Sequence, residues 1–271
     1  MESQTIVLYH YCSMQSFYSI ICNKNIRLSD SRCTNDYLEN TWIVKTINDV
    51  LTSRFKEDYP QNVKQLLPYI EHIKFGFKPY IACFSEARDL LSQWRAYADD
   101  GNGVAIGFKF SIPQGVPFFY SGADVIGKSL SIEKVIYNDE DQKKLINETV
   151  TQCVEDSEKN IFCYGNRLGL LSFVYKNPAF YEEREWRIIN AVIIDANNIL
   201  GGAISPLHYR VTNNSMISYL EFPIDKEHGL CEIEEVVLGP KNYTIADTLH
   251  SFLEMNGFHK VKIDRSKTTY R

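Results

Sequence analysis

The stretch YEEREWRIINAVIID, residues 181–195, begins with charged residues and continues as an apolar run rich in isoleucine and valine. Successive side chains of a β-strand point to opposite faces, so the spacing predicts Glu183, Glu185 and Arg187 on one face. The apolar run after Trp186 predicts a strand deep inside a sheet, where charged groups require a structural or functional reason.

The two carboxylates of this stretch form the first candidate site. Two steps along a strand place Glu183 and Glu185 roughly 6.6 Å apart, with Arg187 beside them. Such a pair can hold sugar hydroxyls, stabilise a developing positive charge, or divide acid and base roles between two separated pKa values. The alternative is a solvated edge strand whose charges form cross-strand ion pairs.

The rest of the chain alternates strand-like and helix-like segments. Strands are predicted at 6–11, 26–29, 79–86, 103–110, 116–120, 132–137, 184–195, 218–224, 234–239 and 259–264. Helices are predicted after a Ser13 cap, at 37–55, at 63–75, at 89–100 with an Asp89 cap, within 139–175 and at 246–257. This order predicts an α+β fold in which helices flank a mixed, largely antiparallel sheet. We expect residues 1–271 to form a single elaborated domain, with helical insertions near 37–75 and 139–175.

Composition places the chain among globular proteins and excludes several partners. Of its 271 residues 44% are hydrophobic and 23% are charged, which excludes a disordered, collagenous or coiled-coil protein. A net charge of -5 does not attract phosphate backbones, so nucleic acid is not a predicted partner. No apolar run approaches the roughly 20 residues that cross a bilayer, so we predict no membrane association and a cytoplasmic protein.

The cysteines and histidines do not predict a metal centre. The seven cysteines lie far apart without a C-x-x-C pair, and the six histidines form no H-E-x-x-H motif. We therefore expect no metal, and we interpret the cysteines as reduced thiols of the core.

Two further groups of residues are candidate binding positions. Trp94 and Tyr97 are three residues apart on a predicted helix and share a face that could stack a ring, although such aromatics are more often core residues. His10 ends the first predicted strand and would lie near Ser29 if the first two strands pair. A single histidine is also more often structural than functional.

The segment from Gly122 to Ser129 fits the phosphate-loop pattern G-x-x-x-x-G-K-S, with Asp195 as a potential magnesium ligand. A P-loop nucleotide hydrolase is therefore one alternative. The residues that follow are β-branched and aromatic, whereas the motif must open onto a helix, and Asp124 adds a negative charge to the phosphate cradle.

The chain also resembles an uncharacterised bacterial family that contains a domain of unknown function. The resemblance rests on the order of LYHY (8–11), IRLSDSRCTNDYLE (26–39), ACFSE (82–86), QWRAYADDGNGVAIGF (93–108), YEEREWRI (181–188), EEVVLG (234–239) and a terminal S-x-x-x-YR. These motifs cover nearly the whole chain, but the family implies no established activity.

His10, Ser29 and Glu183-x-Glu185 are also similar in order to motifs of the ADP-ribosyltransferase superfamily. The resemblance implies an enzyme that uses NAD as its substrate, with Glu185 offsetting the positive charge that grows as nicotinamide leaves and Glu183 orienting the acceptor. It implies that His10 and Ser29 hold ribose, and that Trp94 or Tyr97 stacks nicotinamide. Arg187 would contact phosphate or steady the carboxylates.

Such an enzyme would modify a protein acceptor or partner and would be a toxin or a phage-defence effector. The competing interpretation is a ligand-sensing or scaffold domain without catalysis, in which the same aromatic and charged residues form a packed polar core or a partner surface.

Overall fold

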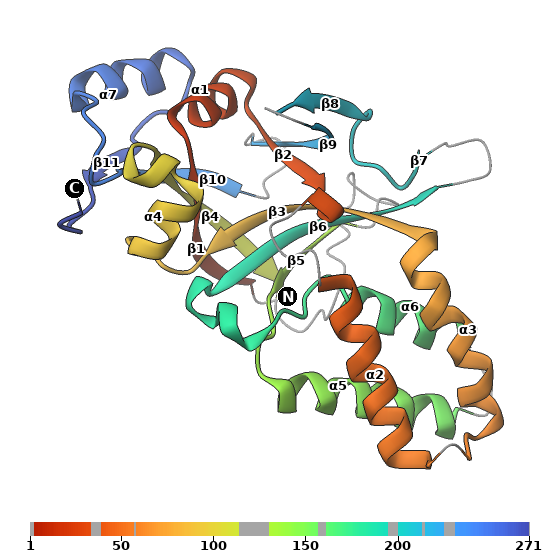
Figure 1. Ribbon diagram of the computed structural model, residues 1–271. Helices are drawn as coiled ribbons and strands as arrows, with labels where there is room; N and C mark the ends of the chain where they lie inside the picture. Colours follow the sequence, from red (N-terminus) through yellow and green to blue (C-terminus); the bar gives the residue numbers. More distant parts are fainter. Residues whose placement is uncertain are drawn as a thin grey trace.

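In the described part of the chain eleven strands pair into one branched sheet, and helices flank its faces (Figure 1). The computed structural model describes residues 3–33, 39–56, 58–113, 130–156, 161–194, 200–212, 215–224 and 231–270. Every pair of named strands among these residues is antiparallel except β10 with β11, which is parallel. The predicted α+β fold with a mixed, largely antiparallel sheet is confirmed.

The strands are β1 (Ser3–Cys12), β2 (Asn25–Asp30), β3 (Phe77–Ser85), β4 (Val104–Pro113), β5 (Leu130–Lys134), β6 (Glu185–Ile194), β7 (Leu200–Gly201), β8 (His208–Val211), β9 (Met216–Pro223), β10 (Cys231–Leu238) and β11 (Lys262–Arg265). The α-helices are α1 (Met14–Asn23), α2 (Glu39–Phe55), α3 (Gln61–Gly76), α4 (Leu91–Tyr97), α5 (Asp139–Glu155), α6 (Ile161–Leu171) and α7 (Ala246–Met255). The 3-10 turns are η1 (Ser31–Cys33), η2 (Asp99–Gly101) and η3 (Pro178–Glu183).

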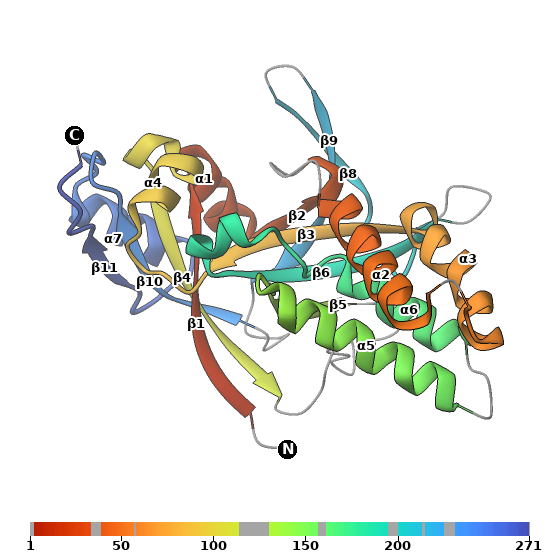
Figure 2. The same cartoon turned by 60° about the horizontal axis from the view of Figure 1, so that its bottom comes forward.

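Helices α2, α3, α5 and α6 occupy the two ranges predicted as helical insertions. Figure 2 shows these four helices gathered on one side of the molecule, with α1, α4 and α7 on the other. The short strands β7 and β8 were not predicted, and the strand predicted at 116–120 lies outside the described residues. That the whole chain forms one domain stays a prediction.

Strand β3 organises the sheet because three other strands pair with it. One edge of β3 pairs with β6 over its whole length, ending where Ser85 lies opposite Glu185. The other edge is shared by two strands, since β2 pairs with it at Tyr80 and Ile81 whereas β1 pairs with it at Ser85. Strands β1 and β2 therefore separate along this edge, and residues 82–84 of β3 lie in the gap between them.

Two large apolar cores pack against β3 and β6. Phe84 and Ile188 belong to the core that includes side chains of α1 and α7, whereas Ile81 and Ile189 belong to the core formed with α2, α3, α5 and α6. Neighbouring residues of each strand thus enter different cores, as the period of two requires. Full burial of a side chain such as Phe84 contributes roughly 1.5–3 kcal/mol, so both cores hold β3 and β6 in place.

The two predicted helix caps have different outcomes. Ser13 caps α1 as predicted, because its side chain accepts a hydrogen bond from the backbone amide of Ser16 (3.2 Å). The predicted Asp89 cap is wrong, since α4 begins after Leu90 and has no side-chain cap. Asp89 instead accepts hydrogen bonds from Trp94 and from residues 266–268, which fastens the C-terminal segment to α4.

Candidate functional site

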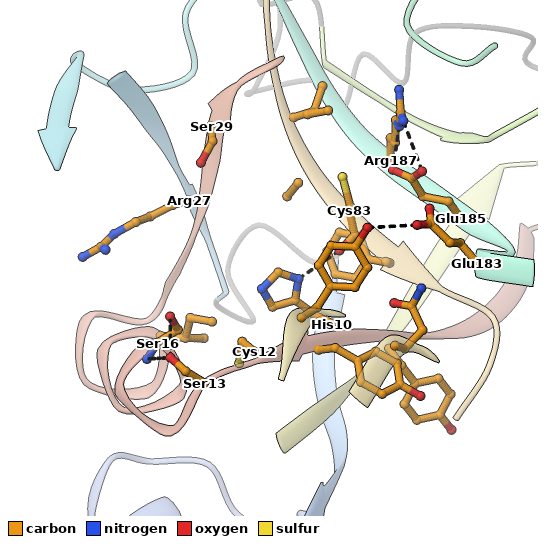
Figure 3. Close-up of a pocket in the computed structure, with 18 of the residues that line it drawn as sticks. His10, Cys12, Ser13, Ser16, Arg27, Ser29, Cys83, Glu183, Glu185 and Arg187 are labelled. Atoms are coloured by element: carbon orange, nitrogen blue, oxygen red, sulfur yellow. Dashed lines mark hydrogen bonds and ion pairs between the residues drawn. The ribbon is translucent and has the colours of Figure 1, made fainter. Parts of the chain in front are cut away.

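A cavity of about 410 Å³ opens where β1 and β2 separate (Figure 3). Its lining comes from β1, the first part of α1, β2 and β3, with further side chains from α4, η3, the start of β6 and β8. Volumes of roughly 300–1,000 Å³ are usual for sites that bind small molecules. The branching of the sheet at β3 therefore creates a space of suitable size and brings distant parts of the sequence to it.

His10 stands on β1 at the edge of the gap. Its Nδ1 donates a hydrogen bond to the backbone carbonyl of Cys83 (2.9 Å), and because a carbonyl only accepts, the proton must be on Nδ1. Burial lowers the pKa of His10, and the bond to Cys83 opposes this shift without cancelling it. The imidazole is therefore neutral at pH 7, and its second nitrogen, which points away from Cys83 in Figure 3, is an acceptor for a hydroxyl.

Ser29 lies on β2 and lines the same cavity as His10. The first two strands do not pair with each other, because β3 lies between β1 and β2 and pairs with both. The Ser29 hydroxyl accepts a hydrogen bond from Nη2 of Arg210 on β8 (3.3 Å). The two residues thus contribute to one site through the gap and not through a strand pair.

Glu183 and Glu185 lie on different elements. Glu185 is the first residue of β6, whereas Glu183 ends η3, and Arg184 between them has a left-handed backbone (φ 45°). The predicted single strand face is therefore correct for Glu185 and Arg187 and wrong for Glu183. Lys176 still joins the two carboxylates, since its Nζ lies 2.6 Å from Glu183 Oε2 and 2.9 Å from Glu185 Oε2.

Arg187 completes this buried group, called here the carboxylate cluster (Lys176, Glu183, Glu185 and Arg187). Its Nε and Nη2 donate to the two oxygens of Glu185 (2.7 and 3.1 Å), and Nη1 donates to the carbonyl of Phe173 (2.8 Å). The Arg187 side chain is only 2% exposed. Two roles were predicted for Arg187, contact with phosphate or steadying of the carboxylates. Its hydrogen bonds to Glu185 correspond to the second role.

The ion pairs keep Glu185 charged. Burial alone would raise the pKa of Glu185, but the cations Arg187 and Lys176 outweigh it and lower the pKa to about 2. Burial would likewise lower the pKa of Lys176, whereas Glu185 and Glu183 raise it. Desolvation and the nearby Glu185 carboxylate raise the pKa of the Cys83 thiol, which lies beside the cluster in the cavity lining.

The two predicted aromatic residues separate. Tyr97 lines the cavity, and its hydroxyl donates to Glu183 Oε1 (2.9 Å). Trp94 is fully buried against Tyr11, does not line the cavity and donates its indole N–H to Asp89. Trp94 is therefore a core residue, and its prediction as a ring-stacking residue is wrong.

Three cationic residues of the cavity were missed in the sequence. Lys176 stands in an irregular segment, which has no periodicity that assigns a face. Arg27 could have been found, because the alternation in IRLSD places it on the same strand face as Ser29. Arg210 stands on β8, a strand of four residues that is too short to give a clear pattern.

The cysteines differ in part from the interpretation as core thiols. All seven are free, but only Cys12, Cys153 and Cys231 are buried. No group of three or more His, Cys, Asp or Glu side chains that could hold a metal ion is present among the described residues. The phosphate-loop motif at 122–129 and Asp195 lie outside the described residues.

The middle of the chain matches a known protein family. Residues 93–188 match the family described as Protein of unknown function (DUF2971). This confirms the resemblance to a family that contains a domain of unknown function. The DUF2971 match spans Tyr97 and the carboxylate cluster, whereas His10, Ser29, Arg27 and Arg210 lie outside it.

No curated protein and no solved structure matches the chain significantly. Within the described residues, none of the helices combines the length and the apolar character needed to span a membrane.

Proposed function

We propose that the protein is an ADP-ribosyltransferase-like enzyme that binds NAD in the cavity and transfers its ADP-ribosyl group to an acceptor, such as a protein side chain. One observation carries the proposal: His10 of β1, Ser29 of β2 and the carboxylates Glu183 and Glu185 line one cavity although they lie far apart in sequence. A neutral histidine, a hydroxyl and paired carboxylates are groups that bind ribose hydroxyls and offset positive charge.

The exposures assign different roles to the two carboxylates. The Glu183 side chain is 16% exposed, whereas that of Glu185 is 5% exposed and is held by both Arg187 and Lys176. We assign Glu183 to direct contact with the ribose. Glu185 acts as a positioning residue that holds Lys176, which in turn holds Glu183.

In the proposed reaction the bond between C1′ of the ribose and the nicotinamide nitrogen breaks, and its electron pair leaves with nicotinamide. The ribose then carries positive charge, which the Glu183 carboxylate offsets. An acceptor nucleophile forms the new bond to C1′ and gives up its proton to a carboxylate. His10 accepts a hydrogen bond from a ribose hydroxyl through Nε2, and Tyr97 and Lys176 fix the orientation of Glu183.

A non-enzymatic ligand-binding domain is the second candidate function. It is favoured by the saturation of Glu185, whose two oxygens already accept three hydrogen bonds from Arg187 and Lys176. A structural ion-pair network of this kind holds a fold together without any reaction. In that case the cavity binds a ligand without converting it into a product.

The test is NAD consumption and transfer of labelled ADP-ribose by the purified protein, with bacterial lysate as the source of acceptors. We expect Glu183→Gln to reduce turnover at least about 100-fold while the protein stays folded and still binds NAD, because Lys176 keeps its ion pair with Glu185. Glu182→Gln is the matched control, because this neighbouring carboxylate is exposed and bonds to Ser92 outside the cavity.

Equal turnover in wild type and Glu183→Gln would remove Glu183 from the mechanism. NAD binding without consumption by the wild type would favour the second candidate, and the absence of both would contradict the NAD proposal.

A further inference from the structure

Two arginines line the cavity apart from the carboxylate cluster. Arg27 stands on β2 and Arg210 on β8, and both contribute to the cavity wall. Figure 3 shows Arg27 and Ser29 projecting from the same side of β2, while Glu183 and Glu185 lie on the opposite side of the view. The cavity thus has a carboxylate end and an arginine end.

Both arginines are held in place by uncharged partners. Arg27 stacks its guanidinium on the ring of Tyr219 at 4.9 Å and donates from Nη2 to the hydroxyl of Ser19 (3.1 Å). Arg210 donates from Nη2 to Ser29, and its buried Nε has no hydrogen-bond partner among the residues that the structure describes. A buried N–H donor without a partner costs free energy, so this arrangement has a donor that a ligand can satisfy.

The positive charges of the arginine end have no balancing carboxylate in the described part of the chain. Among the described residues no carboxylate lies within ion-pair distance of Arg27 or Arg210. Glu221, which lies opposite Arg27 in the strand register, is close to His208 instead (3.8 Å). Burial and the repulsion of Arg27 lower the pKa of Arg210, so this pair of like charges is costly without an anion.

The charge balance of the whole cavity identifies the ligand chemistry. Its lining contains two carboxylates, Glu183 and Glu185, and these are already paired with Lys176 and Arg187. As far as the described residues line it, the cavity is therefore left with two uncompensated positive charges, those of Arg27 and Arg210. A diphosphate carries compensating negative charge and several acceptor oxygens, which guanidinium groups bind in a bidentate manner.

We propose that Arg27 and Arg210 form a diphosphate-binding subsite, so that the cavity takes a ligand with a diphosphate at one end and a ribose at the other. Ser13 and Ser16 at the start of α1 also line the cavity, and the Ser16 hydroxyl, which accepts a hydrogen bond from the Ser13 hydroxyl, is available as a further donor. For NAD as the ligand this subsite rests on the proposed function, because the diphosphate would then position the ribose at Glu183. Binding of a diphosphate as such does not depend on any reaction.

Calorimetric titration with three probes tests the subsite. Inorganic pyrophosphate has the diphosphate alone, ADP has it with a nucleoside, and adenosine lacks it. We expect the wild type to bind pyrophosphate and ADP, and Arg27→Gln and Arg210→Gln each to weaken both at least about tenfold, with little change for adenosine. Arg54→Gln is the matched control, since Arg54 is an exposed arginine of α2 outside the cavity.

The outcomes separate this subsite from the proposed reaction. Pyrophosphate binding that depends on both arginines, in a protein that does not consume NAD, supports the subsite and contradicts the transferase. NAD turnover with a KM unchanged in Arg27→Gln and Arg210→Gln contradicts the subsite and supports the transferase. Failure of the wild type to bind millimolar pyrophosphate, or equal weakening by Arg54→Gln, also overturns the subsite.

Discussion

The two ends of the cavity solve the problem of buried charge in opposite ways. In the carboxylate cluster, Lys176 and Arg187 neutralise Glu183 and Glu185 at distances of 2.6–2.9 Å. At the other end, the contacts of Arg27 and Arg210 with described residues are to hydroxyls and an aromatic ring. The first arrangement is complete without a ligand, whereas the second is incomplete. From this comparison we expect the carboxylate cluster to stabilise the fold and the arginine end to contribute to the affinity for a ligand.

The largest effect on stability is expected from breaking the carboxylate cluster. Arg187→Met leaves the buried Glu185 with one cation fewer, and a broken buried ion pair costs about 3–5 kcal/mol of the free energy of unfolding. Urea denaturation followed by circular dichroism measures this loss, with Arg54→Met as the exposed control. A loss below about 1 kcal/mol would show that the cluster is not a stabilising unit.

Acid should weaken the same cluster in wild-type protein. The pKa of Glu185 is about 2 in the folded state and 4.5 as its ordinary value. The low pKa of Glu185 therefore contributes about 3 kcal/mol to the free energy of unfolding. This contribution is fully present above pH 4.5 and is lost as the pH falls toward 2. The measurement compares the free energy of unfolding of wild type and Glu185→Gln from pH 5.5 to 2.5, because other acidic groups titrate equally in both. Parallel curves would contradict the low pKa.

His10 should give a smaller dependence at higher pH. The pKa of His10 is lowered in the folded state. Its contribution to the free energy of unfolding is therefore fully present above pH 6.5, and it is lost as the pH falls from there through the folded-state pKa. We expect the free energy of unfolding of wild type to fall relative to that of His10→Asn as the pH drops from 7.5 to 5.5. A His10→Asn curve with the wild-type slope would contradict the neutral imidazole.

The smallest effect on stability is expected at the arginine end. Arg210→Gln removes one of two like charges, so the free energy of unfolding should change by less than about 0.5 kcal/mol or increase slightly. Thermal and urea denaturation at low ionic strength measure this change. A loss of more than about 2 kcal/mol would mean that Arg210 has a structural role and would remove the contrast between the two ends.

Much of the fold follows from residue patterns, because apolar periodicity reports which side chains are buried. The apolar runs of β3, β4, β6 and β10 and the Gly257 stop after α7 could be recognised in this way. The short edge strand β8 was not, since four residues give too few periods for a pattern. Strand order was also beyond reach, because pairing of β3 with β1, β2 and β6 depends on tertiary contacts.

The site was predicted in part, and its errors have physical causes. His10, Ser29, Tyr97, Glu183, Glu185 and Arg187 do reach one cavity. The alternation rule failed at Glu183, because the left-handed Arg184 ends η3 before the strand begins. Spacing placed Trp94 beside Tyr97, but spacing does not tell which of two neighbouring aromatics faces the core. Lys176 has no local signal, since only the folded chain brings it between the two carboxylates.

The shared edge of β3 has a mechanical consequence. β1 pairs with β3 at one residue and β2 pairs with it at two, whereas β6 pairs with it over its whole length. A ligand that contacts both His10 on β1 and Ser29 on β2 would bridge the gap between these two strands. The signature of occupancy is then slower amide hydrogen exchange in β1 and β2, while the exchange of the distant helices α2, α3, α5 and α6 is unchanged.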